Sequence, residues 1–110
     1  MPRYISTVRA APAALQGLLK EPSNRQEVLA PLYAANGITL EQWYMSPDTM
    51  EIIAIASCAD PAALDRLVLT VASAGMLDLS TYSIRRILTG AELAETARAA
   101  DASIYRPPGA

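Results

Sequence analysis

One short stretch of the chain, residues 38–57 (ITLEQWYMSPDTMEIIAIAS), concentrates side chains that could do chemistry. Within it Glu51 alternates with Ile53 and Ile55, and residues two apart in a β-strand share one face. A carboxylate among apolar neighbours loses hydration, which favours its protonated form and suits it to proton transfer. Glu51 is therefore the candidate catalytic residue. Its alternative role is that of an exposed glutamate at the end of a strand.

Five further residues are candidates for binding a small molecule. Trp43 and Tyr44 can stack on a flat ligand, or they can anchor a core or an interface. Tyr4, Ser6 and Tyr82 belong to two segments that we expect to be neighbouring strands, and their hydroxyls can donate hydrogen bonds into a pocket. The alternative for these three residues is ordinary packing with satisfied hydroxyls.

The residues that the chain lacks exclude several chemistries. There is no histidine and a single cysteine, Cys58, which rules out Ser-His-Asp and Cys-His catalysis and the usual ligands of zinc and haem. Neither a Gly-x-Gly-x-x-Gly sequence nor a phosphate-binding loop occurs. We predict that no cofactor and no tightly bound transition metal or haem accompanies the protein. Cys58 has no evident activating neighbour, so we expect a buried, inert thiol.

Charge and hydropathy limit the partners. The net charge is −2, from nine basic and eleven acidic residues spread along the chain. Nucleic-acid binding normally requires a basic surplus or stripe, so we expect no nucleic-acid partner. No secretion signal is present, and no apolar run approaches the roughly 18–20 residues that cross a bilayer. With one cysteine and no internal disulfide, we expect a soluble cytoplasmic protein.

Residues 38–57 predict a β-hairpin. In residues 38–43, Ile38, Leu40 and Gln42 alternate with Thr39, Glu41 and Trp43, which predicts a half-exposed strand. Residues 50–57 are apolar on both faces, which is typical of a central strand that is covered on both sides. The chain's own helices can cover only one side of the sheet. We therefore expect a second copy of the chain to cover the other side, giving a homodimer or an assembly of dimers.

Capping residues, prolines and glycines mark where the helices begin and end. Four helix starts are expected: Pro12, Ser23 with Gln26 as a capping box, Asp60-Pro61, and Thr89 with Glu92 as a second capping box. Pro31 lies inside the second helix and should bend or loosen it. Gly37 and Gly75 are expected to end the second and third helices in the left-handed conformation.

With a strand at residues 4–9 and another at residues 76–87, the order is strand, helix, strand, strand, helix, strand, helix. This order predicts an α+β fold, the ferredoxin-like βαββαβ plan with an extra C-terminal helix. The first helical region is expected to be interrupted at Pro22. Residues 1–102 should form one domain and residues 103–110 a C-terminal tail.

At this point the chain resembles the GYD-domain family, small bacterial and archaeal proteins of mostly unassigned function. The similarity covers about residues 3–98 and rests on the opening RYIS, the segment LEQWYMSPDTMEIIAI, the Asp60-Pro61 helix start and the turn at Gly75. At the naming motif the Gly, Tyr and Asp places hold Asp48, Met50 and Glu51. The resemblance implies protomers that pair sheet-to-sheet as a dimeric α+β barrel. Similar barrels host cofactor-free oxygenases, isomerases, haem enzymes and binding proteins, so no single reaction is implied.

Three classes of function follow. The first is a binding module that holds a small apolar or aromatic molecule in a cleft near the hairpin. The second is a cofactor-free enzyme of oxygenase, isomerase or cyclase type, with Glu51 or a tyrosine transferring a proton. The third is a structural or assembly protein without a ligand. A packed apolar face of the sheet away from the helices would favour assembly, and a hollow containing Glu51 and tyrosine hydroxyls would favour a ligand or catalysis.

Overall fold

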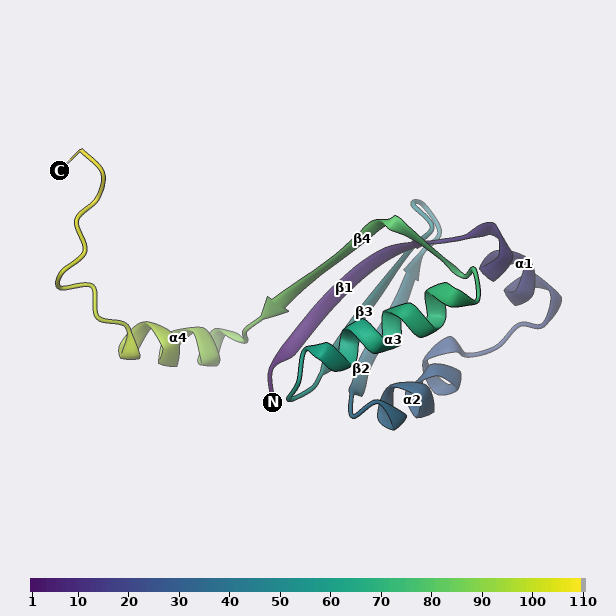
Figure 1. Cartoon of the computed structure of the whole chain (residues 1–110), viewed down its shortest axis with the longest axis horizontal. Helices are drawn as coiled ribbons and strands as arrows, with labels where there is room; N and C mark the ends of the chain where they lie inside the picture. Colours follow the sequence, from purple (N-terminus) through teal and green to yellow (C-terminus); the bar gives the residue numbers. More distant parts are fainter. Residues whose placement is uncertain (110) are drawn as a thin grey trace.

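The computed structural model describes residues 1–109 and shows a ferredoxin-like α+β fold (Figure 1). Ala110, the last residue of the expected tail, lies outside the described residues. The elements in chain order are β1 (Arg3–Ala10), α1 (Pro12–Lys20), α2 (Arg25–Ala35), β2 (Thr39–Ser46), β3 (Glu51–Ser57), α3 (Ala62–Ser73), β4 (Leu77–Ile87) and α4 (Gly90–Ala99). Within this part of the chain the strands form one antiparallel sheet in the order β2-β3-β1-β4. The predicted fold class is confirmed.

The pairing of β1 with β3 decides which side chains meet the helices. Val8 lies opposite Ile52 and Ser6 opposite Ala54, and these even-numbered residues lie on the face covered by α1, α2 and α3, the helix face. The odd-numbered residues of both strands lie on the other face, which we call the open face. Its apolar side chains from the two central strands are Ile5, Ile53 and Ile55, all half-buried.

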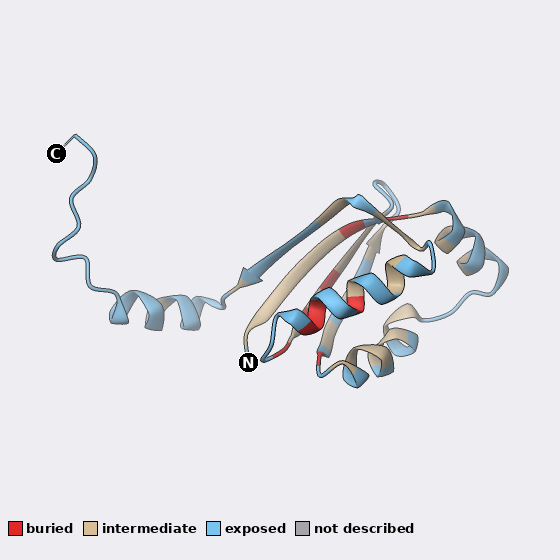
Figure 2. Cartoon of the chain, viewed as in Figure 1, coloured by how far each residue is buried: buried red, intermediate tan, exposed pale blue. Residues whose placement is uncertain are grey.

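Most of the buried residues gather where α3 begins beside the end of β3 (Figure 2). This cluster comprises Ile38, Ala56, Cys58, Ala63, Leu64 and Leu67, with Tyr4, Leu32 and Tyr33 packed against it. Cys58 is fully buried, as predicted, and its burial, together with the nearby Asp60, raises the pKa of its thiol. A raised pKa keeps the sulfur protonated and poorly nucleophilic.

Several predicted helix boundaries are confirmed by local hydrogen bonds. The Asp60 side chain accepts a bond from the backbone N–H of Ala62 at 3.0 Å, and Thr89 and Glu92 form the expected capping box. Gly37 and Gly75 have positive φ angles of 77° and 75° at the ends of α2 and α3. These positions favour glycine because a Cβ is strained there.

The predicted capping box between Ser23 and Gln26 is wrong. Asn24 caps α2 instead, its side-chain oxygen accepting bonds from the backbone N–H groups of Gln26 at 3.1 Å and Glu27 at 3.4 Å. The Gln26 side chain is engaged by β2, where its Nε2 donates to the carbonyl of Glu41 and its Oε1 accepts from the N–H of Trp43. A long-range contact between Gln26 and β2 has therefore replaced the local capping box.

The second helix, α2, contains Pro31 and continues through it to Ala35.

The predicted alternation along residues 38–43 is interrupted by a β-bulge at Glu41. Leu40 pairs with Ala56, but the next pair joins Gln42 to Ile55, so one residue of β2 has no partner. Strict alternation would place Trp43 and Leu40 on opposite faces. Because of the extra residue, Trp43 pairs with Ala54 and joins Leu40 on the helix face.

The last helix, α4, extends away from the sheet and its covering helices (Figure 1). The radius of gyration is 17.5 Å, against about 13 Å for a compact chain of roughly 100 residues. Leu93 in α4 and Ile104 and Tyr105 beyond it are exposed. No helix within residues 1–109 has the length and apolar character needed to cross a membrane.

Candidate ligand-binding cavity

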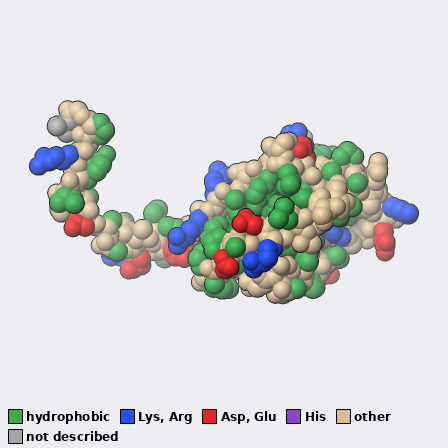
Figure 3. Space-filling model, viewed as in Figure 1, with side chains coloured by type: hydrophobic (Ala, Val, Ile, Leu, Met, Phe, Trp, Pro, Cys, Tyr) green, Lys and Arg blue, Asp and Glu red, His purple; other side chains and the backbone are tan. Residues whose placement is uncertain are grey.

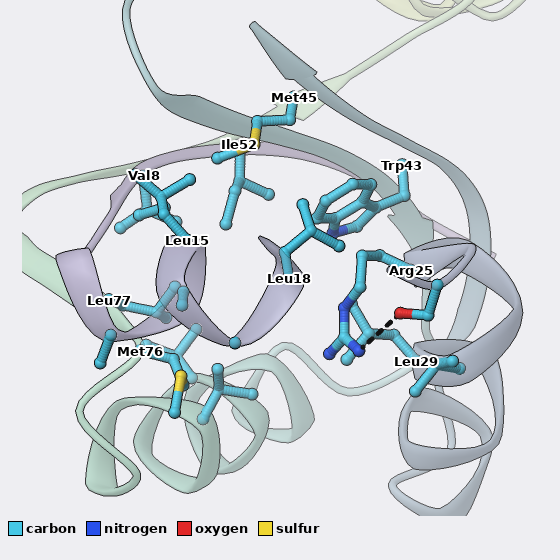
Figure 4. Close-up of a pocket in the computed structure, with 18 of the residues that line it drawn as sticks. Val8, Leu15, Leu18, Arg25, Leu29, Trp43, Met45, Ile52, Met76 and Leu77 are labelled. Atoms are coloured by element: carbon cyan, nitrogen blue, oxygen red, sulfur yellow. Dashed lines mark hydrogen bonds between the residues drawn. The ribbon is translucent and has the colours of Figure 1, made fainter. Parts of the chain in front are cut away.

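A cavity of about 550 Å³ lies between the helix face of the sheet and the three helices that cover it (Figure 4). Its volume is in the range of about 300–1,000 Å³ that is usual for small-molecule sites. Most of its wall is apolar, and includes Val8, Leu15, Leu18, Leu29, Trp43, Met45, Ile52, Met76 and Leu77. The wall can therefore surround an apolar body and exclude water from it.

The β2–β3 hairpin supplies Trp43, Met45 and Ile52 to this wall. Trp43 reaches the cavity because it pairs with Ala54 on the helix face, and Gln26 fastens the bulged segment beside it to the start of α2. The Nε2 of Gln26 donates to the carbonyl of Glu41 at 3.3 Å, and the Oε1 of Gln26 accepts from the N–H of Trp43 at 3.2 Å. The only tryptophan of the chain is therefore held in place by both a strand and a helix.

A second irregularity shapes the β4 side of the cavity. Thr7 pairs with Ser83 but Arg9 pairs with Asp78, so β4 carries extra residues between these two pairs. The Thr81 hydroxyl compensates for the interrupted ladder, accepting from the N–H of Arg9 at 2.8 Å and donating to the carbonyl of Asp78 at 2.7 Å. Bulges of this kind re-aim side chains next to binding sites. Here the residue that follows Thr81, Tyr82, lines the cavity.

Two tyrosines from different elements form the polar part of the inner wall. Burial, with a smaller effect of nearby Tyr82, raises the pKa of Tyr33 to about 12. Burial also raises the pKa of Tyr82, with Asp65 adding to the shift. Within residues 1–109 neither hydroxyl donates or accepts a hydrogen bond with another protein group. Both phenols thus stay protonated at neutral pH and are free to bond to a ligand.

A set of charged and polar side chains lies at the rim of the cavity where α1 gives way to α2: Glu21, Ser23 and Arg25. The Nη1 of Arg25 donates to the hydroxyl of Ser23 at 3.3 Å, drawn as the dashed line in Figure 4. Elsewhere on the surface seen in Figure 3, charges of both signs are scattered and form no basic stripe.

The cavity brings together three of the predicted site residues, Trp43, Ser6 and Tyr82. Tyr4 lies on the same face of β1 as Ser6 but packs against the buried cluster around Cys58. It therefore does not line the cavity.

Tyr44 and Glu51 lie on the open face, across the sheet from the cavity. Tyr44 is half exposed and its hydroxyl donates to the Oε1 of Gln42 at 3.3 Å. Glu51 shares its face with Ile53 and Ile55, as the strand period predicts, and lies opposite Arg9 in the register with β1. A carboxylate there cannot touch a molecule held in the cavity.

Tyr33 and Arg25 are cavity residues that the sequence analysis did not identify. The signal that could have found them is helical spacing, since Arg25, Leu29 and Tyr33 follow one another at intervals of four residues. Residues four apart lie on one side of a helix. Leu29 lines the cavity, so its polar neighbours at that spacing share its surroundings.

Neither protein-family models nor curated proteins yield a match to this chain. The fold and the cavity, with the side chains that line it, are accordingly the basis on which its function is inferred.

Alkaline pH should destabilise the wild-type protein more than a Tyr33→Phe variant. The pKa of Tyr33 is about 12 in the folded protein against an ordinary 10.0, so between these pH values the folded protein retains a proton that the unfolded chain releases. The stabilisation is complete below pH 10 and is lost as the pH rises through 12. Across this pH range we expect the free energy of unfolding of the wild type to fall by roughly 1–2 kcal/mol more than that of Tyr33→Phe, a value that allows for the partial exposure of Tyr33.

Urea unfolding at neutral pH and in steps between pH 10 and 12 measures this effect. A Tyr105→Phe variant is the matched control, because that ring is exposed beyond α4, away from both the cavity and the open face. If the free energy of unfolding depends on pH in the same way for the wild type and Tyr33→Phe, Tyr33 is not the buried phenol described above.

Proposed function

We propose that this protein binds a small apolar or aromatic molecule in the cavity between the β2–β3 hairpin and α1, α2 and α3. The observation that carries the proposal is the composition of the cavity wall. An apolar space of about 550 Å³ is lined by one tryptophan and two tyrosines. Sites of this kind hold an apolar body by burial and orient it through a few polar groups.

The state of these tyrosines supports binding over proton abstraction. A tyrosine that acts as a general base needs a lowered pKa, whereas burial raises the pKa of both Tyr33 and Tyr82. Glu51, the other candidate for proton transfer, lies on the opposite face of the sheet. Tyr33 and Tyr82 therefore serve best as neutral hydrogen-bond donors to a bound molecule.

Titration with naphthamide, a neutral aromatic probe, tests the proposal. Trp43 is the only tryptophan, so its emission reports directly on the cavity. We expect saturable quenching or a spectral shift and one site per chain, with a Kd of about 1 mM or tighter for a probe of this size. Calorimetry with a Trp43→Phe variant controls for optical artefacts. No change in emission and no heat of binding up to the solubility limit would refute the proposed function.

The second part of the proposal is that two copies of the chain pair through their open faces, as the resemblance to GYD-domain proteins implies. Within residues 1–109 no helix covers the apolar centre of this face, Ile5, Ile53 and Ile55 (Figure 1). Around it lie charges of both signs, including Arg9 and Glu51. Such a surface is self-complementary under a two-fold axis, as an isologous dimer requires. A stable interface would bury about 800 Å² on each copy.

Sedimentation should show a dimer at low micromolar concentration, and Ile53→Arg should convert it to a monomer with unchanged helix and strand content. A guanidinium in the centre of the interface would be desolvated without a partner. Leu69→Arg is the matched control, because Leu69 is 66% exposed on α3, away from the open face. A folded wild-type monomer at this concentration would contradict the dimer.

A further inference from the structure

We infer that the molecule bound in this cavity is an amphipathic carboxylate whose anionic head pairs with Arg25 while its apolar body fills the space beside Trp43. The inference rests on the proposed binding function and specifies its ligand class. It concerns a side chain, Arg25, that neither the fold nor the core requires.

The first observation is where the Arg25 side chain lies. It is half-buried, lines the cavity, and in Figure 4 extends among the apolar side chains of Leu18, Leu29 and Trp43. Placing a charge among apolar groups is unfavourable unless an opposite charge or several hydrogen bonds compensate it. Its one bond among the described residues, to the Ser23 hydroxyl, leaves most of its five N–H donors unused.

The second observation is the lack of an internal counter-charge. Arg3, by comparison, pairs with Glu41 at 2.8 Å and with Glu92 at 3.6 Å. No carboxylate within residues 1–109 forms an ion pair with Arg25, not even Glu21, which also lines the cavity. Glu21 is exposed at the end of α1, so water screens its charge more than that of Arg25. The uncompensated charge inside the rim is positive.

The third observation is that the backbone at Arg25 is held from both sides. Asn24 caps α2 at 3.1 Å, and Gln26 is bonded to the bulged segment of β2. Arg25 lies between these two anchors, so its side chain starts from a fixed point next to Trp43. A preorganised guanidinium loses less conformational entropy when it binds an anion, and its planar fork matches a carboxylate in two parallel hydrogen bonds.

These observations define the ligand's shape. A carboxylate at Arg25 sits at the rim, near the first backbone N–H groups of α2, whose helix dipole also favours an anion. From there an apolar or aromatic body can extend along Trp43 and Met45 toward Tyr33 and Tyr82, which also line the cavity. Short-chain acyl or aromatic acids have this form.

Two probes of the same shape separate charge from fit: naphthoate and the uncharged naphthamide, with the same ring position. We expect wild-type protein to bind naphthoate about tenfold more tightly than naphthamide, as for a charge-assisted hydrogen-bonded pair at a partly exposed site. In Arg25→Gln this preference should vanish, while naphthamide affinity stays within about threefold of the wild type. Arg25→Lys should retain part of the preference because it keeps the charge without the fork.

Arg66→Gln, an exposed arginine on α3, is the control and should leave both affinities unchanged. Circular dichroism and the retained naphthamide affinity verify that Arg25→Gln folds. Equal binding of the two probes by the wild type, or a naphthoate preference that survives in Arg25→Gln, would overturn the inference while the proposed function stands. Binding of neither probe would refute both.

Discussion

Replacing Ala14 with phenylalanine should weaken naphthamide binding by at least about tenfold while leaving the protein as stable as the wild type or more so. Ala14 lies on α1 and lines the cavity of about 550 Å³. A phenyl group at this position projects into space that the folded chain leaves empty, so it competes with the ligand for the same volume. It also gains apolar contacts with the wall, and cavity filling commonly adds about 0.5–2 kcal/mol to the free energy of unfolding.

Trp43 emission and calorimetry measure the loss of binding, and urea unfolding measures the stability. Ala91→Phe places the same substitution on exposed α4, away from the cavity, and should leave naphthamide affinity unchanged. If Ala14→Phe binds the probe as tightly as the wild type, the probe occupies another site, and the cavity is not the binding site.

A second large effect is expected from Leu64→Ala, which should lower the free energy of unfolding by about 2–4 kcal/mol. Leu64 is 6% exposed and belongs to the buried cluster with Ile38 and Cys58. Truncating it removes apolar burial and leaves a void that its neighbours on β3 and α3 can fill only in part. Because Leu64 does not line the ligand cavity, naphthamide binding to the folded variant should persist.

Leu69→Ala on the same helix is a closely matched control, since Leu69 is 66% exposed. The same substitution there should change the free energy of unfolding by no more than about 0.5 kcal/mol. Both variants are compared with the wild type by urea unfolding at one protein concentration, because association would add to apparent stability. Equal losses at the two positions would mean that the cluster around Leu64 is not the core of the domain.

The amino-acid sequence by itself determined the elements whose stability is local. Asp60, Gly75 and the Thr89–Glu92 pair act on backbone groups within a few residues, so their effect can be predicted without knowing the rest of the fold. The apolar content of β3 likewise required a place at the centre of a sheet. Combined with the order of strands and helices, that requirement predicts the ferredoxin-like sheet that the structure shows.

Tertiary structure alone decided which side chains share the cavity. The bulge at Glu41 moves Trp43 to the helix face, and Gln26, seventeen residues before Trp43, bonds across it. The same Gln26 contact replaces the local capping box that the sequence pattern favours. Two consecutive polar residues, Glu41 and Gln42, interrupt the alternation of the strand, but the hydrogen bonds that hold the extra residue come from Gln26 on a distant helix, and only the tertiary structure brings it there. Trp43 and Glu51, close together in the hairpin sequence, face opposite sides of the sheet because Ser46 pairs with Glu51 and Trp43 lies three residues before Ser46.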